Sequence, residues 1–390
     1  MPQKHPAPKQ REDDVRFMRR ALRLAARGAG ETNPNPVVGC VIVKHGRVVG
    51  EGFHARAGGP HAEVVALERA GARARGATLY VTLEPCAHRG RTAPCAPRVA
   101  AAGVARVVAA IADPFPRVSG RGFALLRRAR VLVETGVEAD AARALNAVFL
   151  GAARLRRPFV LLKAAATLDG RIATPAGESK WITGAAERRA ARALRRLCDG
   201  VLVGVGTALA DDPLLLPSPR TRRPAFRVVL DSRLRLPLES LLVRSISPRA
   251  PLLVVTCESA LRGRAAHARR LTAAGAAIVP APERAGRVLL PAALAKLRRL
   301  GLFSLMVEGG SEVLGSFLAE RLFDAFVLFR APLLLGGRGS RPAFGGPDPK
   351  ALAEAVRLVP GPPLARLIDP LGHAAAGALA EVWYPRFRQA

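Results

Sequence analysis

Hydrophobic residues recur with different spacings in different segments of the chain, and the first clear spacing is that of a helix. Residues 13–27 place apolar side chains at Phe17, Ala21, Leu22 and Leu24, a spacing that predicts an amphipathic helix. Shorter apolar runs follow. They predict a β-hairpin over 37–43 and 48–53, helices over 61–73, 96–102 and 122–129, and strands over 77–83, 104–111 and 131–134.

A second series of alternating elements begins after residues 141–157, which we expect to form a helix and a basic connector closed by Pro158. Strands are expected over 159–164, 200–204, 226–230, 252–256, 276–279, 303–307 and 325–329, and helices over 185–197, 261–274, 289–300 and 311–320. Helices that alternate with apolar strands are typical of α/β proteins with mostly parallel sheets. We therefore predict a disordered tail over residues 1–12, one domain over 13–150 and a larger domain over 158–390.

Length and composition support globular domains and exclude several other classes of protein. The 390 residues correspond to two or three domains of typical size, and 49% hydrophobic residues are too many for a disordered chain. No apolar run approaches the ~20 residues that a membrane-spanning helix needs, and residues 1–14 lack the apolar stretch of a secretory signal. Five scattered cysteines do not form a disulfide scaffold. A cytoplasmic protein with free thiols is therefore expected.

The net charge of +31 arises from 61 Lys+Arg residues against 30 Asp+Glu residues. Most of the basic residues are arginines, which are spread over polar helix faces along the whole chain. We interpret this charge as a solvated basic surface without a nucleic-acid partner, whose field attracts phosphorylated small molecules. Proteins that act on nucleic acid or bind it are the alternatives.

The pattern most specific for chemistry is His61 and Glu63, separated by one residue, followed by Cys86 and Cys95, each after a proline. One imidazole and two thiolates are three ligands for a tetrahedral Zn²⁺ ion and leave its fourth position for water. The same residue types mark the zinc-dependent deaminases. Glu63 is expected at a helix start beside the metal, where it can carry a proton from water to a ring nitrogen and then to the leaving ammonia. The sequence therefore predicts a hydrolytic deaminase.

The spacing of the two cysteines leaves an alternative for the metal ligands. Eight residues separate Cys86 from Cys95, where two are usual for this kind of site, and His88 lies between them. Cys86 with His88 is therefore a rival ligand pair. We favour Cys95, because it follows a proline at a predicted helix start, just as Cys86 follows a proline at a predicted strand end.

Wider motifs surround these residues in both halves of the chain. They cover residues 32–39, 52–54, 60–63, 82–86 and 90–95, and then 163–173, 178–183, 204–207, 210–213, 307–310 and 336–337. Together they resemble the bifunctional deaminase/reductase (RibD) family of riboflavin biosynthesis, and the long insert between the cysteines is itself a mark of that family. The resemblance implies an α/β protein with an N-terminal cytidine-deaminase-like three-layer sandwich and a C-terminal dihydrofolate-reductase-like domain. It also implies Zn²⁺ and NADPH as cofactors. A deaminase acting on a base in nucleic acid would need neither this insert nor a reductase half. The intact set of His61, Glu63, Cys86 and Cys95 argues against a basic nucleic-acid-binding protein on a decayed deaminase scaffold.

For the first half, the resemblance implies deamination of 2,5-diamino-6-(5-phosphoribosylamino)pyrimidin-4(3H)-one, a phosphorylated pyrimidine. Asn35 would hydrogen-bond the pyrimidine edge, since an amide offers both a donor and an acceptor. His54, His88 and Arg91 would hold the ribose phosphate. One position departs from the family: Phe115 stands where Asn is usual, so one polar contact is in doubt.

For the second half, the resemblance implies NADPH reduction of the ribosyl group of 5-amino-6-(5-phosphoribosylamino)uracil to a ribityl group. Glycines at 204–206 and 309–310 would let the main chain approach the cofactor, and the helix start at Ser311 would face its pyrophosphate. The implied cofactor contacts are Ala165, Trp181, Thr207, Asp211, Ser232, Gly310, Ser311, Glu312, Val313, Leu314, Gly315 and Ser316, and the implied substrate contacts are Ser179, Arg195, Leu215 and Glu308.

A second departure concerns the substrate phosphate of the reductase. Ser218 stands where the family has an Arg that helps fix this phosphate, and Arg220 or Arg222 is expected to take over. If neither reaches it, the alternative is a zinc deaminase with an impaired or substrate-shifted reductase half. The sequence leaves the formation of a homo-oligomer open.

Overall fold

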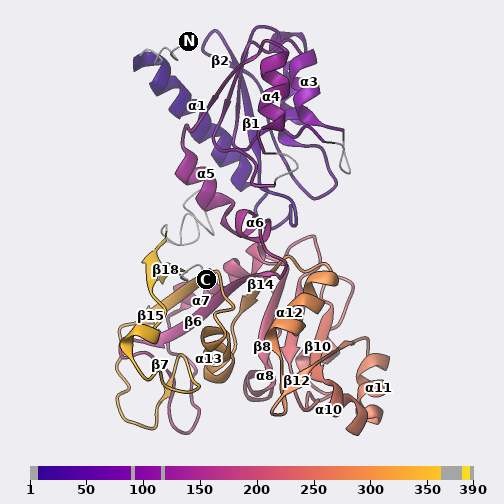
Figure 1. Cartoon of the computed structure of the whole chain (residues 1–390), viewed down its shortest axis with the longest axis vertical. Helices are drawn as coiled ribbons and strands as arrows, with labels where there is room; N and C mark the ends of the chain where they lie inside the picture. The colour runs from indigo at the N-terminus through magenta and orange to yellow at the C-terminus, as the bar shows by residue number, and fades with distance from the viewer. Residues whose placement is uncertain (1–7, 89–92, 116–118, 362–379, 387–390) are drawn as a thin grey trace. The chain divides into compact units, whose positions relative to one another are not determined.

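The computed structural model describes residues 8–88, 93–115, 119–361 and 380–386, drawn as the coloured ribbon of Figure 1. The chain divides into two compact units, with the division between Arg154 and Leu155. Each unit has a sheet and a hydrophobic core of its own. Within the residues described, no helix combines the length and the apolar character needed to cross a membrane.

The sheet of the first unit has five strands in the order β2-β1-β3-β4-β5. β1 runs antiparallel to β2 and β3, whereas β3, β4 and β5 are parallel. The strands are β1 (Gly39–Lys44), β2 (Arg47–Phe53), β3 (Thr78–Val81), β4 (Arg106–Ala109) and β5 (Leu132–Thr135). The helices are α1 (Pro8–Ala26), α2 (Ala62–Ala70), α3 (Cys95–Ala101), α4 (Arg121–Arg128), α5 (Ala139–Leu145) and α6 (Ala147–Ala152), with a 3-10 turn over Gly71–Ala74.

Helices cover both faces of this sheet, and two glycines show how closely they pack. A Cβ atom on Gly39 would lie 2.0 Å from the Ala21 oxygen of α1. A Cβ atom on Gly52 would lie 2.7 Å from the Ala62 oxygen of α2. Gly52 pairs with Cys40, the residue after Gly39, and successive residues of a strand face opposite sides. α1 and α2 therefore lie on opposite faces, which confirms the three-layer sandwich.

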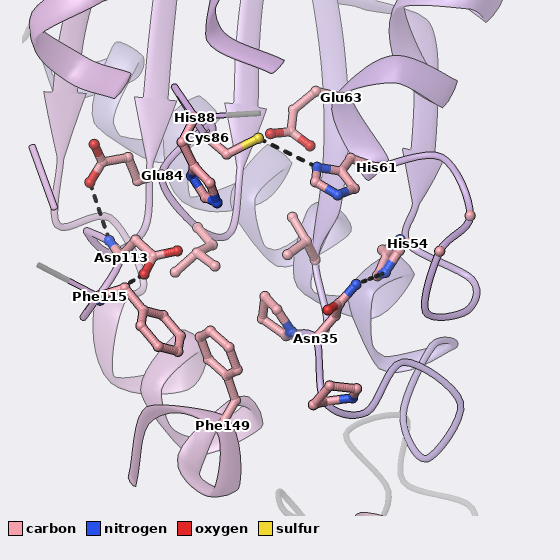
Figure 2. A pocket seen from close by; sticks show the side chains of 16 residues that line it. Asn35, His54, His61, Glu63, Glu84, Cys86, His88, Asp113, Phe115 and Phe149 are labelled. Carbon is pink, nitrogen blue, oxygen red and sulfur yellow. Dashed lines mark hydrogen bonds between the residues drawn. The ribbon is translucent and has the colours of Figure 1, made fainter. Parts of the chain in front are cut away.

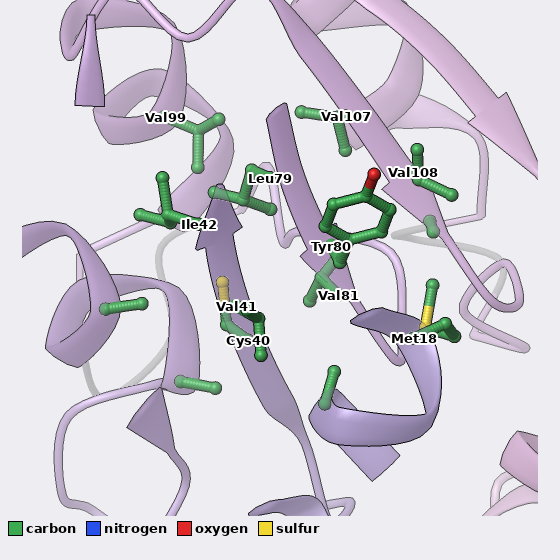
Figure 3. Close-up of a cluster of buried hydrophobic side chains, with 14 of the residues drawn as sticks. Met18, Cys40, Val41, Ile42, Leu79, Tyr80, Val81, Val99, Val107 and Val108 are labelled. Carbon is green, nitrogen blue, oxygen red and sulfur yellow. The ribbon is translucent and has the colours of Figure 1, made fainter. Parts of the chain in front are cut away.

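The core of the first unit is centred on β1, β3 and β4. Val41, Ile42, Leu79 and Val107 have no exposed surface, and Figure 3 shows them among the buried side chains of this core. Strands that are covered on both faces carry continuous apolar runs, because neither face meets water. This is why the sequence shows runs rather than strict alternation at these strands.

One group of charged side chains is buried with α1. Arg106 of β4 donates two hydrogen bonds to Asp14, at 2.8 and 2.7 Å, and two to Glu134 of β5, at 3.0 and 2.6 Å. The Tyr80 hydroxyl also donates to Asp14, over 2.8 Å. Since Asp14 and Arg106 are 2% and 8% exposed, removal of Arg106 would leave Asp14 as an uncompensated buried charge.

The main sheet of the second unit has nine strands among the described residues, in the order β11-β10-β9-β8-β14-β6-β15-β18-β17. The strands from β11 to β15 are parallel, and β18 and β17 are antiparallel additions at one edge. The strands are β6 (Phe159–Thr167), β8 (Gly200–Gly204), β9 (Phe226–Leu230), β10 (Leu252–Cys257), β11 (Ala277–Ala281), β14 (Ser304–Val307), β15 (Ala325–Ala331), β17 (Leu358–Pro360) and β18 (Ala380–Pro385). Two small ribbons join β7 (Arg171–Ala173) to β16 (Arg341–Pro342) and β12 (Glu283–Arg284) to β13 (Arg287–Val288).

The helices of the second unit connect these parallel strands. They are α7 (Ala185–Leu194), α8 (Val205–Asp211), α9 (Leu241–Arg244), α10 (Glu258–Gly263), α11 (Ala265–Ala273), α12 (Leu290–Arg299) and α13 (Ser311–Ala319), with 3-10 turns at Arg195–Leu197 and Leu352–Glu354. A parallel sheet with crossover helices confirms the expected α/β class for this half.

Two expectations from the sequence need correction, and one helix was not expected. Residues 8–12 belong to α1 rather than to a tail, since Pro8 can begin a helix and the polar residues after it are exposed on its first turns. The helix expected over 261–274 is two helices, because the backbone leaves helical geometry at Arg264, after Gly263. The short helix α8 had no counterpart among the expected elements, because its apolar face is too short to show a period.

Candidate active sites

The three expected metal ligands lie together in the first unit. Nδ1 of His61 is 3.1 Å from Sγ of Cys95 and 3.6 Å from Sγ of Cys86. The ligand atoms of the three residues all lie within 4.8 Å of one another. The described part of the chain brings Cys95 into this cluster and not His88, so the rival pair of Cys86 with His88 is not the one assembled. One imidazole and two sulfurs at this separation fit a Zn²⁺ ion.

Each of these side chains is placed by the end of a regular element. His61 is the N-cap residue of α2, and Cys95 is the first residue of α3, after Pro94. Cys86 follows the end of β3. A hydrogen bond from the Cys95 thiol lowers the pKa of the Cys86 thiol to about 4. Cys86 is thus held as a thiolate, the form that binds metal.

Glu63 lies in the first turn of α2 and points to the same cluster, as Figure 2 shows. It is 3% exposed, and burial raises the pKa of its carboxyl to about 7. A group with a pKa near the working pH can accept a proton and release it again. The position and the environment of Glu63 therefore suit a proton carrier.

Asn35 and His54 form a pair at the side of the cavity (Figure 2). His54 Nε2 lies 3.1 Å from Asn35 Nδ2, and His54 Nδ1 lies 3.0 Å from the carbonyl oxygen of Pro60. The carbonyl can only accept, so Nδ1 carries the hydrogen and Nε2 accepts from the amide. Burial lowers the pKa of His54, which favours this neutral form. With both ring nitrogens engaged, His54 is placed to orient the Asn35 amide, and its contact with the ribose phosphate stays a prediction.

The cavity next to the metal cluster, lined by His61 and Cys86, has a volume of about 390 Å³. Asn35, His54 and His88 line it, and Arg91 lies outside the described residues. Phe115 and Phe149 also line it, with ring centroids 5.7 Å apart. At the position where the family has an amide, this chain therefore places part of an aromatic wall.

Two further carboxylates line this cavity and were not among the expected site residues. Burial raises the pKa of Asp113 to about 6, and its carboxylate accepts the N–H of Phe115 over 2.9 Å. Glu84 lies inside one of the quoted motifs, two residues before Cys86. Its place in that motif was the only sequence signal for a role.

The second unit contains a larger cavity, of about 790 Å³. Most of the expected cofactor residues line it, together with Ser179 and Glu308. The expected residues along its wall are Ala165, Ser179, Trp181, Thr207, Asp211, Glu308, Gly310, Ser311, Glu312, Val313 and Leu314. It is also lined by Lys163, Lys180, Arg188 and Arg341, which were not expected.

Five expected residues do not line this cavity, and their contacts show why. Ser232 accepts the Val288 N–H over 3.2 Å, and the Ser316 hydroxyl donates to Glu312 of its own helix. A Cβ atom on Gly315 would lie 1.8 Å from the Gly345 oxygen, so this glycine allows a close backbone contact. The remaining two are Leu215, which is 3% exposed in a hydrophobic cluster, and Arg195, whose guanidinium lies against Glu308.

A buried ion pair forms one side of the second cavity. Arg195 donates two hydrogen bonds to Glu308, at 2.6 and 3.0 Å, and one to the carbonyl of Leu216. Lys163 Nζ lies 3.9 Å from the same carboxylate. Despite its burial, Glu308 has a lowered pKa because of Arg195, while burial lowers the pKa of Lys163. The cavity thus presents a cation and an anion side by side.

The residues of this cavity fit a pyridine dinucleotide. Gly309 and Gly310 have no side chains at the start of α13, whose N-cap has no side-chain hydrogen bond, and Gly310 N–H donates to Thr207 Oγ1 over 3.1 Å. Free N–H groups at a helix start favour a pyrophosphate. Lys180, Arg188 and Arg341 add positive charge around the same cavity.

Comparisons with known proteins agree with both sites. Residues 11–111 match the model of the cytidine and deoxycytidylate deaminase zinc-binding region, and residues 158–360 match the RibD C-terminal domain. The riboflavin biosynthesis protein RibD of Aquifex aeolicus (strain VF5) is 44% identical over 327 residues, which cover 84% of this chain and 89% of that protein.

Two solved structures are similar over nearly the whole chain. RibD of Acinetobacter baumannii, form 1, has a TM-score of 0.80 at 36% identity and covers 97% of this chain and 100% of its own. A Thermotoga maritima protein described as a diaminohydroxyphosphoribosylaminopyrimidine deaminase/5-amino-6-(5-phosphoribosylamino)uracil reductase has a TM-score of 0.77 at 32% identity, with the same coverage.

The fold, the metal cluster and the second cavity define an enzyme with two activities, a zinc-dependent deaminase followed by an NADPH-dependent reductase. The chain belongs to the RibD family of riboflavin biosynthesis proteins. The expected family, fold class and cofactors are thereby confirmed.

Proposed function

We propose that residues 13–150 deaminate 2,5-diamino-6-(5-phosphoribosylamino)pyrimidin-4(3H)-one, with His61, Cys86 and Cys95 as the Zn²⁺ ligands. The observation that carries this proposal is the cluster of one imidazole and two sulfurs beside the buried carboxylate of Glu63. When bound there, Zn²⁺ supplies hydroxide near neutral pH by making water more acidic. The substrate follows from the similar Thermotoga maritima protein, whose description names it.

Glu63 carries the proton in this proposal. Its carboxylate accepts a proton from the attacking water and delivers it to the ring nitrogen beside the reacting carbon. The proton of the newly added hydroxyl then passes through Glu63 to the exocyclic amine. A carbon–oxygen bond forms, the carbon–nitrogen bond breaks, and ammonia leaves. The raised pKa of Glu63 allows both directions of transfer.

Asn35 is assigned to the edge of the pyrimidine ring. Its amide is held by His54, which is itself fixed by the carbonyl of Pro60. A donor that cannot rotate discriminates between rings by the position of their acceptors. His54, His88 and Arg91 stay the predicted contacts for the ribose phosphate.

We infer that residues 158–390 reduce the ribosyl group of 5-amino-6-(5-phosphoribosylamino)uracil. NADPH, when bound, supplies the hydride, which is delivered to C1′ of the open-chain imine. The imine nitrogen then needs a proton. Lys163 is the buried cation of the cavity, and Glu308 lies 3.9 Å from it, so Lys163 can donate the proton while Glu308 and Arg195 hold its position.

The loop with Ser218 matters because the alternative function, an impaired reductase, rests on the missing arginine at this position. Ser218 is exposed, and its N–H donates to the Arg192 carbonyl over 3.2 Å. Ser218 is followed by Arg220 and Arg222. We propose that a neighbouring arginine binds the substrate phosphate in place of the family's residue, and no observation favours the impaired enzyme.

One experiment tests both halves. Metal analysis of the purified protein is combined with separate assays of ammonia release and of NADPH oxidation on the two phosphorylated pyrimidines. Bound zinc with both activities supports the proposal. A protein without zinc, or one that oxidises no NADPH with the deaminated compound, contradicts the corresponding half. The cytoplasmic location, the lack of a nucleic-acid partner and the oligomeric state stay predictions.

A further inference from the structure

The carboxylate of Glu84 collects main-chain N–H groups from a distant segment. Oε1 accepts from Gly122 over 2.9 Å and, less closely, from Phe123 over 3.4 Å. Oε2 accepts from Gly120 over 3.0 Å and from Asp113 over 3.2 Å. The side chain is 3% exposed, and Figure 2 shows its bond to Asp113. A buried carboxylate is costly unless it is fully hydrogen-bonded, and these four donors meet that need.

Two of the donors belong to the first turn of α4, so Glu84 caps this helix from outside. The N-cap residue of α4 is Gly120, which has no side chain with which to accept them. A carboxylate at this place satisfies free N–H groups and also interacts favourably with the positive end of the helix. The start of α4 is therefore fixed to the segment that follows β3.

This segment leads directly to the metal cluster, because Pro85 alone separates Glu84 from Cys86. A Cβ atom on Gly122 would lie 2.0 Å from the Pro85 oxygen, so α4 packs on Pro85 without a gap. On the other side, the Ala96 N–H donates to the Cys86 oxygen over 3.0 Å. The main chain around Cys86 is thus held from both directions.

The same carboxylate also fixes a wall of the cavity. Its bond to the Asp113 N–H sets the start of the 113–115 turn, and the Asp113 carboxylate then accepts the Phe115 N–H over 2.9 Å. Asp113 and Phe115 both line the cavity. One side chain therefore holds both the segment that carries a sulfur ligand and a segment of the cavity wall.

We propose that Glu84 is a positioning residue of the deaminase site, which places Cys86 for the metal and Asp113 and Phe115 for the substrate. It acts through its hydrogen bonds to the main chain. The inference rests on the assignment of Cys86 as a metal ligand. Residues that orient metal ligands from outside typically change metal affinity by about 10- to 100-fold when they are replaced.

The test is Glu84→Gln, which keeps the shape but turns an NH₂ group toward main-chain donors. Zinc affinity is measured by competition with a chromogenic chelator, and ligand geometry by the absorption spectrum of the Co²⁺-loaded protein. We expect zinc to bind about 10- to 100-fold more weakly, a changed Co²⁺ spectrum and a raised KM for deamination. Wild-type affinity, spectrum and KM would overturn the proposal.

Asp14→Asn is the matched control, because Asp14 is a buried, hydrogen-bonded carboxylate of the same unit that lines no part of the cavity. It should lower thermal stability and leave zinc affinity, the Co²⁺ spectrum and KM unchanged. If Asp14→Asn shifts these three quantities as Glu84→Gln does, general destabilisation explains both and the proposal is wrong.

A second pair of variants covers the case in which Glu84→Gln does not fold. Glu84→Asp keeps the charge on a shorter side chain, and Gly122→Ala disturbs the same contact from α4. Both should weaken zinc binding in the same direction, and wild-type affinity in both would refute the inference. A wild-type protein that binds no zinc in the same titration would instead refute the ligand assignment itself.

Discussion

Nδ1 of His61 lies 3.1 Å from Sγ of Cys95, although the two residues are 34 positions apart in the chain. The start of α2 carries the imidazole and the start of α3 carries the sulfur. The geometry of the site therefore depends on how two helices pack on one sheet. Substitutions can therefore distinguish residues that bind the metal from residues that transfer protons.

Glu63→Gln should retain zinc and lose deamination. The three ligands stay in place, while the group that transfers protons is gone, so we expect kcat to fall by about 10²- to 10⁴-fold. Zinc content by metal analysis and ammonia release are the two measurements. The reductase assay on the same sample is the control, and ammonia release at the wild-type rate would refute the role of Glu63.

Gly310→Val should weaken NADPH binding by on the order of tenfold, which corresponds to ~1.4 kcal/mol. The backbone of Gly310 has φ −67°, which any residue can adopt, so the fold should tolerate the change while the methyl groups crowd the start of α13. NADPH fluorescence titration measures the effect. Deamination should be unaffected, and an unchanged titration would contradict the proposed cofactor site.

As the pH rises, the reductase should lose activity at a pH below about 10.4, the usual pKa of lysine. Burial lowers the pKa of Lys163, so its ammonium, the form that donates a proton, is lost as the pH rises through this lowered value. A pH profile of kcat/KM for NADPH oxidation shows this limb. Lys163→Arg, which stays charged, should move the limb to higher pH in whatever activity remains; an unshifted limb would assign it to another group.

Arg106→Met should destabilise the first unit by about 3–5 kcal/mol, because Asp14 would be left as a buried carboxylate without its cation. The double variant Asp14→Leu/Arg106→Met should recover much of this loss, since both charges are removed. Urea unfolding of the three proteins gives the comparison. A double variant no more stable than Arg106→Met would show that the charge left behind is not the cause.

Phe115→Asn restores the residue usual in the family. This substitution removes the ring contact with Phe149. We expect the free energy of unfolding to fall by about 0.5–1.5 kcal/mol, in addition to the loss that comes from burying less apolar surface. The KM for deamination should fall if an amide at this place contacts the substrate. A double-mutant cycle with Phe149→Leu isolates the ring contact; a coupling energy near zero would contradict it.

The metal site could be predicted from the sequence because its residues occur in short, spaced patterns tied to element ends. The structure decided between Cys95 and His88, a choice that spacing left open. Most strands of both sheets could also be predicted, because each one is marked by a short apolar run in the sequence. The strands β17 and β18, the last two of the second sheet, were missed, since partly exposed strands have no such runs.

The second cavity was harder to predict, because its lining depends on which way each side chain points. Leu215 was expected to contact the substrate but packs into the core. Gly315 was expected to contact the cofactor, but it allows a close backbone contact with Gly345. Arg341 reaches the cavity only through the pairing of β16 with β7. The role of Glu84 could not be predicted either, because it depends on four main-chain N–H groups that lie far from Glu84 in the sequence.

Each of the two cavities is lined by residues from one side of the division between Arg154 and Leu155. A gene cut at this point would encode two shorter polypeptides, each with a full set of lining residues. Fusion in one chain then guarantees equal amounts of the two catalysts, whatever the level of expression.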